Sequence, residues 1–199
     1  MTRREFDIPA TKIYQSLFNL PASPTRSVGQ SLKDTLRWTY FREDESEAFW
    51  RENIGFAADT YSHMRVFYAL GVNFVEAEGN FFTPNEARMF LLGVLCHDFG
   101  EGEIGGDHQG DIAWFSKDSS HEEKEQFIAR AIISALDIDE DLKDEMVAAY
   151  NAVVVGEDKK LNQAFRALEV TEYVITALKI FQKAKEENIT FLFFRIMII

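Results

Sequence analysis

The amino-acid sequence predicts an all-α protein built as a bundle of packed helices. Helix-breaking residues are scarce, with 4 Pro and 11 Gly among 199 residues, whereas helix-forming residues are common. Apolar residues make up 46% of the chain and recur at the three- and four-residue intervals of amphipathic helices. We find no convincing strand pattern. This apolar share is sufficient for a substantial core, which excludes a disordered chain.

The chain is expected to begin with an irregular arm and to continue as one domain. Residues 1–26, with Pro21 and Pro24, are interpreted as the N-terminal arm. Residues 27–199 are predicted to form a single helical domain, since typical domains have about 100–150 residues. Its first helices are expected over residues 27–40 and 45–52.

The two central helices have the clearest signals. Over residues 60–78, apolar side chains follow helical spacing. Thr83, Pro84 and Glu86 then form the pattern of an N-cap, a proline at the first helical position and a capping-box glutamate. The helix expected over residues 84–98 contains an apolar run and is therefore predicted to be central and buried.

A long glycine-containing loop and three more helices complete the predicted fold. Residues 101–120 form the loop, and loops of this length are usually functional. A capping box over residues 119–123 opens a helix to about residue 136, Asp139 caps the next to about residue 150, and the last is expected over residues 159–185. The apolar end, residues 189–199, fits a buried helix, a subunit interface of a homodimer or an altered terminus.

Charge and cysteine content exclude several classes of partner. The formal net charge of −12 disfavours duplex nucleic acid and anionic membranes, which need a basic surface. It does not exclude a small phosphate ester. The single cysteine, Cys96, excludes an intramolecular disulfide and a cysteine-based zinc site. With no signal peptide and no apolar run near the roughly 20 residues of a membrane span, the cytoplasm is the expected location.

Two histidines and an aspartate are the candidate metal ligands. His63 lies early in the helix over residues 60–78, and His97-Asp98 ends the central helix. Adjacent helical residues diverge by about 100°, so this pair is expected to bracket an ion at the helix end. Imidazole with carboxylate suits Mn, Co, Fe, Ni or Mg ions. The alternatives are a core histidine at His63 and an ordinary polar helix end at His97-Asp98.

The residues after this pair make the pattern more specific. HDFGE (97–101) leads into GGD (105–107) and GDIA (110–113). Over about residues 59–177 the chain resembles the HD-domain metal-dependent phosphohydrolases, especially their 5′-deoxynucleotidase-like branch. The resemblance implies an HD-domain-like helical bundle that releases phosphate from a nucleotide or similar small phosphate ester.

The same resemblance implies a fourth metal ligand in a downstream helix. His63, His97 and Asp98 match the first three ligand positions of the family. Glu169 stands where the family has an aspartate, and Glu172 is the second candidate. The longer glutamate side chain moves the carboxylate by about one C–C bond.

The resemblance also implies catalytic and substrate-binding residues. Glu101 and a loop aspartate would position a water or act as acid and base. That aspartate is either Asp107 or Asp111, and Asp111 has the better local match. The cation that offsets phosphate charge is expected to be Arg51, and the other candidates are Arg65, Lys117 and Lys124.

Two other functions fit the sequence. The change to Glu169 and the displaced loop aspartate fit a catalytically degenerate HD-type module that binds a nucleotide or a protein partner without turnover. The apolar C-terminus fits a helical dimerisation protein, which would keep His63 and His97 far apart. The sequence does not specify the substrate.

Overall fold

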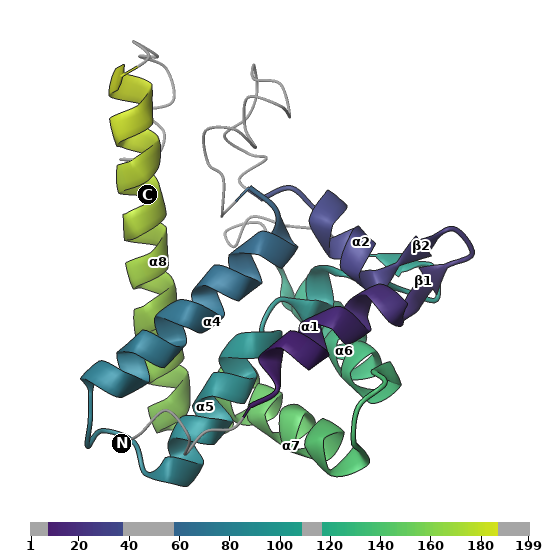
Figure 1. The fold of residues 1–199 in the computed structure, drawn as a ribbon, viewed down its shortest axis with the longest axis horizontal. Coiled ribbons are helices and arrows are strands. Elements are labelled where there is room, and N and C mark those ends of the chain that lie inside the picture. The colour runs from purple at the N-terminus through teal and green to yellow at the C-terminus, as the bar shows by residue number, and fades with distance from the viewer. Residues whose placement is uncertain (1–7, 38–57, 109–116, 187–199) are drawn as a thin grey trace.

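The computed structural model describes residues 8–37, 58–108 and 117–186 of the chain. Within these ranges it contains seven α-helices and two small two-stranded sheets (Figure 1), which confirms the predicted all-α fold. The helices are α1 (Ala10–Asn19), α2 (Val28–Asp34), α4 (Thr60–Ala77), α5 (Pro84–Cys96), α6 (Ser119–Ala135), α7 (Glu140–Tyr150) and α8 (Lys159–Glu186). The helix predicted over residues 45–52 and the apolar end at 189–199 lie outside the described residues.

The segment predicted to be an irregular arm contains helix α1. The side chains of Ile13, Tyr14 and Leu17 share one face of α1 and are buried in the core. After α1 the chain forms a hairpin of β1 (Pro21–Ser23) and β2 (Arg26–Ser27), which holds the two prolines noted above. Pro21 and Pro24 are the reason for predicting an irregular segment, but both follow α1, and burial of three apolar side chains stabilises this helix before the hairpin.

Helix α2 ends earlier than predicted, and the residues that follow it place the Arg37 side chain in the core. The helix stops at Asp34 because Thr35 adopts an extended ψ of 100°. Leu36 then pairs with Asp59 in an isolated β-bridge, and the Arg37 amide donates to the Ala58 carbonyl at 3.1 Å. This short pairing ties the residues after α2 to the start of α4.

Helices α4 and α5 lie side by side, as Figure 1 shows. The predicted capping box at α5 is confirmed: Thr83 Oγ1 accepts from the Glu86 amide at 3.3 Å, and Glu86 Oε2 accepts from the Thr83 amide at 2.8 Å. The Asp59 side chain caps α4 by accepting from the Ser62 amide at 2.8 Å. After α5 come the 3-10 turn η3 (Phe99–Glu101) and the hairpin of β3 (Glu103–Ile104) and β4 (Asp107–His108).

The last helices have caps close to the predicted positions. Asp139 caps α7 as predicted. The capping box of α6 begins at Asp118, slightly earlier than predicted, because its carboxylate accepts from the amides of Ser120 and His121, both at 3.0 Å. The π-helix η5 (Asn151–Val155) continues α7 and ends at Gly156, whose φ of 96° is left-handed.

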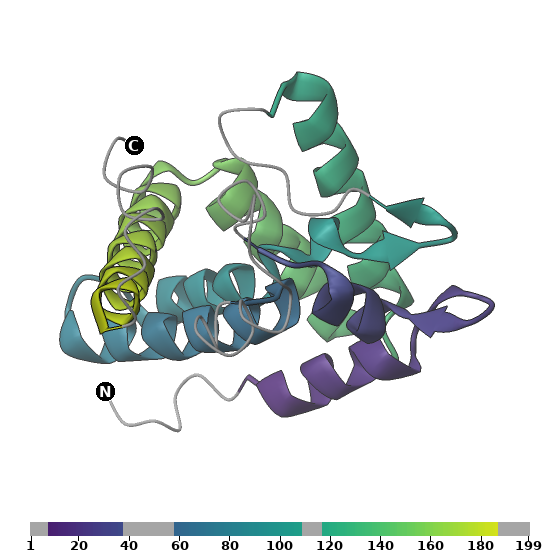
Figure 2. The same cartoon turned by 90° about the horizontal axis from the view of Figure 1, so that it is seen from above.

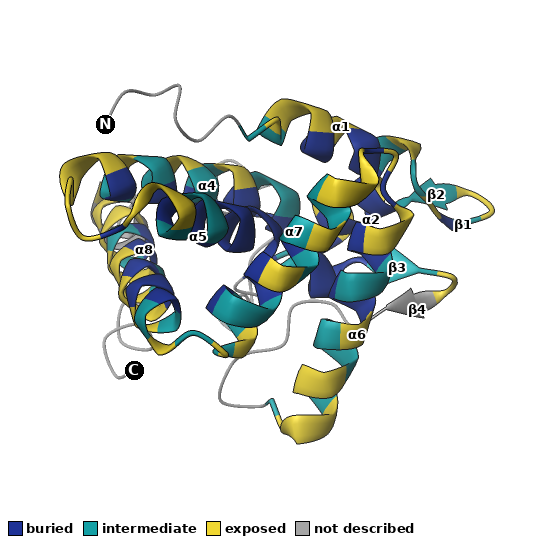
Figure 3. Cartoon of the chain, turned by 90° about the horizontal axis from the view of Figure 1, so that it is seen from below, coloured by how far each residue is buried: buried dark blue, intermediate teal, exposed yellow. Residues whose placement is uncertain are grey.

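The buried core has two parts that meet at α5. One part joins α5 with side chains of α1, α2, α6 and α7. The other joins α5 with side chains of α4, α8 and η5. Figure 3 shows the buried faces of these helices turned toward α5. Helix α8 and the β1–β2 hairpin lie at opposite sides of the molecule, as Figures 1 and 2 agree. Among the described helices, none is long and apolar enough to cross a membrane.

Candidate metal centre

The start of α4 and the end of α5 bring the two histidines and the aspartate together. His63 lies in the first turn of α4, four residues after the Asp59 cap. His97 is the C-cap of α5 and keeps helical backbone angles, whereas Asp98 leaves the helix with φ −100° and ψ 16°. This change of backbone direction helps two adjacent residues, whose side chains diverge by about 100° in a continuous helix, to aim at one point.

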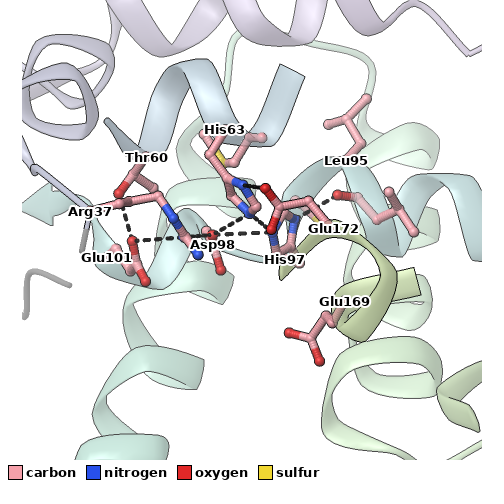
Figure 4. A network of polar contacts seen from close by, with 12 residues as sticks. Arg37, Thr60, His63, Leu95, His97, Asp98, Glu101, Glu169 and Glu172 are labelled. Atoms are coloured by element: carbon pink, nitrogen blue, oxygen red, sulfur yellow. Dashed lines mark hydrogen bonds and ion pairs between the residues drawn. The ribbon is translucent and has the colours of Figure 1, made fainter. Parts of the chain in front are cut away.

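Three acceptor atoms of these residues converge, as Figure 4 shows. The Nε2 atoms of His63 and His97 lie 3.1 Å apart. Asp98 Oδ2 lies 3.4 Å from His63 Nε2 and 3.1 Å from His97 Nε2. Donors about 2.1 Å from an ion lie about 3.0 Å apart at right angles and about 3.4 Å apart in a tetrahedron. The spacing therefore fits a divalent cation, and this buried group could hold one.

The outer nitrogens of both imidazoles face acceptors. His97 Nδ1 is 2.7 Å from the carbonyl oxygen of Val94, and His63 Nδ1 is 3.6 Å from Glu172 Oε1. The Val94 carbonyl can only accept, so His97 carries its ring proton on Nδ1, and the nearby Glu172 carboxylate favours the same tautomer in His63. Both Nε2 lone pairs then point at one another and at Asp98. Three converging acceptors repel unless a cation lies among them, which is the charge pattern of a metal site.

Burial keeps His63, the first of these candidate ligands, neutral at physiological pH. Desolvation, helped by the charge of Arg37, lowers the pKa of His63 to about 4, although Glu172 and Asp98 oppose the shift. Burial alone would raise the pKa of Asp98, but its contact with His97 and the charge of Arg37 lower it well below its usual value. A neutral imidazole beside a charged carboxylate is the protonation state that binds a metal.

A buried arginine and two polar side chains lie beside this group. Arg37 Nη1 donates to Asp98 Oδ2 at 2.7 Å and lies 3.9 Å from Glu101 Oε2. Thr60 Oγ1 donates to that same glutamate oxygen at 2.6 Å. Glu101, a predicted catalytic residue, is thus placed next to the candidate ligands (Figure 4). Arg37 is not among the cations expected at the site from the sequence, where the only signal is a charge within the apolar run Leu36–Phe41.

The two glutamates proposed as fourth ligand have different surroundings. Glu169 forms an ion pair with Arg166 at 2.8 Å, and Figure 4 shows it away from the imidazoles. Glu172, one turn later on α8, is 2% exposed and faces His63. Burial alone would raise the pKa of Glu172, but His63, Arg37 and Thr176 together lower it. Neither glutamate joins the three converging atoms in the described part of the chain.

The remaining predicted site residues lie at the edge of this centre or outside the described structure. Lys117 precedes α6 and forms an ion pair with Glu125 at 2.6 Å. Burial lowers the pKa of Lys117, but the charges of Glu125, Glu101 and Asp98 raise it overall. The backbone of Asp107 lies in β4, while its side chain, Asp111 and Arg51 are outside what the structure describes.

Phenyl rings form the inner wall of the centre. Phe67 stacks on His63 with ring centroids 5.4 Å apart and lies 4.6 Å from His97. Phe165 of α8 meets His97 at 5.8 Å. This apolar wall fixes the two imidazoles and strengthens electrostatic interactions by excluding water.

Comparison with known proteins adds no family to this description. A scan against protein-family models, a search of curated proteins and a search of solved structures each find no match for the chain. The geometry of the centre is therefore the basis for proposing a function.

Proposed function

We propose that the chain is a metal-dependent phosphohydrolase that acts on a nucleotide or similar small phosphate ester. One observation carries the proposal: three acceptor atoms of His63, His97 and Asp98 converge at 3.1–3.4 Å, with an acid and a cation beside them. The mixture of imidazole and carboxylate favours Mn, Co, Fe, Ni or Mg ions.

The neighbouring residues have the chemistry that phosphoester hydrolysis requires. A divalent ion supplies Lewis acidity at a phosphoryl oxygen and a water of lowered pKa. Glu101, held by Thr60, would accept a proton from the attacking water at its carboxylate. The guanidinium of Arg37 would attract an anionic ester while keeping Asp98 and Glu101 in place. Lys117 adds a second positive charge at the edge of the centre.

A binding module without turnover is the second candidate. Within the described residues the converging group has three protein donors, and neither Glu169 nor Glu172 adds a fourth. Such a centre would hold an ion and, through the ion and Arg37, a phosphate group without cleaving it.

Metal analysis followed by a phosphate-release assay tests the proposal. The purified protein is expected to bind one Mn²⁺ or Co²⁺ per chain and to release phosphate from at least one member of a nucleotide panel. His97→Ala should abolish metal binding, while the control Glu169→Ala should retain it. Glu101→Gln should retain the metal but lower the rate by about 10²- to 10⁴-fold.

The outcomes separate the two candidates. Metal binding without phosphate release from any ester, in a wild-type protein that still binds nucleotide, would favour the binding module. Absence of metal binding in the wild type, or full activity in His97→Ala, would overturn the hydrolase proposal.

A further inference from the structure

Glu172 makes a contact that the proposed hydrolysis does not use. Its Oε1 atom lies 3.6 Å from His63 Nδ1, on the side of the imidazole opposite the converging acceptors. Thr176 Oγ1, one turn later on α8, donates to the same oxygen at 2.7 Å. Glu172 and Thr176 are 2% and 1% exposed. A carboxylate this buried needs partners, and here they are a hydroxyl and an imidazole.

The position of this carboxylate determines which ring nitrogen of His63 carries the proton. With the proton on Nδ1, the ring donates toward Glu172 and leaves a lone pair on Nε2. With the proton on Nε2, a lone pair on Nδ1 would face the carboxylate, which is repulsive. The 3.6 Å separation is longer than a hydrogen bond, but such contacts often tighten when a site is filled.

The two histidines are oriented in different ways. His97 Nδ1 meets the carbonyl of Val94 in its own helix, so local backbone geometry fixes that ring. His63 has its acceptor on a side chain of α8, which is distant in the sequence. The ligand on α4 therefore depends on the docking of another helix, whereas the ligand on α5 does not.

We propose that Glu172 is a positioning residue, which fixes the tautomer and orientation of His63 for a divalent cation and is not itself a ligand. The inference depends on the metal site of the proposed function. Outer carboxylates that accept from a ligating histidine play this part in metal centres, and their loss typically costs 10- to 100-fold in metal affinity.

Two measurements test this role. Long-range ¹H–¹⁵N spectra of the metal-free protein are expected to show His63 protonated on Nδ1, and Glu172→Ala should shift it toward the other tautomer. Titration with Co²⁺ should show affinity falling about 10- to 100-fold in Glu172→Ala, with one ion per chain and an unchanged Co²⁺ absorption spectrum. Glu172→Gln, which keeps the shape and one acceptor, should lose less affinity.

The controls separate positioning from ligation and from misfolding. Glu169→Gln alters a glutamate one turn earlier on α8 that pairs with Arg166, and it should change neither measurement. Thr176→Val should weaken Co²⁺ binding less than Glu172→Ala. Circular dichroism establishes whether each variant is folded. If Glu172→Ala does not fold, Glu172→Gln still tests the inference.

Each remaining result would count against the inference. A changed Co²⁺ spectrum in both Glu172 variants, with the wild-type tautomer retained, would identify Glu172 as a direct ligand. Unchanged affinity and tautomer would show that it has no role. If the wild type binds no Co²⁺, the proposed function fails and so does the cation part of this inference, while the tautomer spectra still decide the positioning part.

Discussion

Arg37 compensates buried negative charge at the candidate metal centre. Its side chain is 8% exposed and contacts Asp98, whose side chain is 18% exposed, and Glu101, at 5%. Removing one partner of a buried ion pair leaves the other charged and desolvated, which costs more than the pair itself contributes. A metal ion next to Asp98 would supply the same compensation.

Replacing Arg37 should therefore lower the stability of the metal-free protein more than that of the metal-bound protein. For Arg37→Met we expect the free energy of unfolding to fall on the order of 3 kcal/mol without metal and by clearly less with saturating Mn²⁺. Urea denaturation with and without the ion measures both. In the control Arg166→Met, an exposed pair with Glu169 is lost, and the change should stay below about 1 kcal/mol. Equal losses with and without Mn²⁺ would contradict this account.

Sequence reasoning could bring three candidate ligands together but could not distinguish Glu169 from Glu172. His63, His97 and Asp98 occupy helix ends that local signals predict. The two glutamates are three residues apart on one helix, about 60° apart around its axis, so spacing does not tell which one faces the core. Packing of α8 decides this. Arg37 was missed because its partners, Asp98 and Glu101, become neighbours only in the folded chain.

At the scale of elements, local sequence signals predicted helix starts better than helix ends. The capping box at Thr83 forms as predicted because its hydrogen bonds join residues only three apart in the sequence. The end of α2 at Asp34 depends on a β-bridge with a distant residue, Asp59, and no local signal contains that information. Helix α1 was likewise missed, since its stability comes from core contacts and not from caps.

The crossing of α5 and η5 requires a glycine at position 93. A Cβ atom at Gly93 would lie 2.5 Å from Val153 Cβ, whereas one at Gly71 of α4 would lie 3.1 Å from the Val94 Cγ1 atom. We expect Gly93→Ala to destabilise the protein by about 1–3 kcal/mol through overpacking. The matched variant Gly71→Ala should be closer to neutral, since alanine favours a helix by about 1 kcal/mol. Thermal denaturation compares them, and a neutral Gly93→Ala would refute the close approach.

Glu86 links the start of α5 to α8 and should make the free energy of unfolding depend on pH. Its hydrogen bonds to Lys160 and Thr83 lower the pKa of Glu86 to about 2. A lowered folded-state pKa stabilises the protein above the unfolded value, near 4.3, and the stabilisation is lost as the pH falls toward 2.

Comparison with Glu86→Gln isolates this contribution. The difference in unfolding free energy between wild type and variant should be largest above about pH 5 and should shrink through the window from about 4.3 to 2. Glu76→Gln, at an exposed position on α4, is the control and should give a smaller difference. A difference independent of pH would show that the carboxylate charge is not responsible.

At the scale of the whole molecule, α5 unites the two parts of the core. Leu92 and Leu95 belong to the part with α1, α2, α6 and α7. Phe90, Leu91 and Val94, on the other faces of the same helix, belong to the part with α4, α8 and η5. Because α5 contributes to both parts, its separation from one part would also expose buried side chains of the other. The described bundle is therefore expected to unfold as one unit.

A cavity in either part should therefore lower the midpoint of the same unfolding transition. Ile132→Ala in α6 and Leu161→Ala in α8 remove fully or almost fully buried side chains from the two parts. Each is expected to cost about 2–5 kcal/mol. Denaturation followed by far-ultraviolet circular dichroism and by tyrosine absorbance should give coincident single transitions for both. Two separate transitions in either variant would show that the parts are independent.

The phenyl wall behind the imidazoles also has a consequence for the kinetics of loading. Phe67 and Phe165 close the inner side, and Asp98 is the most exposed of the three candidate ligands. An ion arriving on that side meets the guanidinium of Arg37 already bonded to Asp98 Oδ2. Binding of the ion then requires Asp98 Oδ2 to exchange its contact with Arg37 for a contact with the ion. The association rate should therefore lie below the diffusion limit, and a bound ion should dissociate slowly.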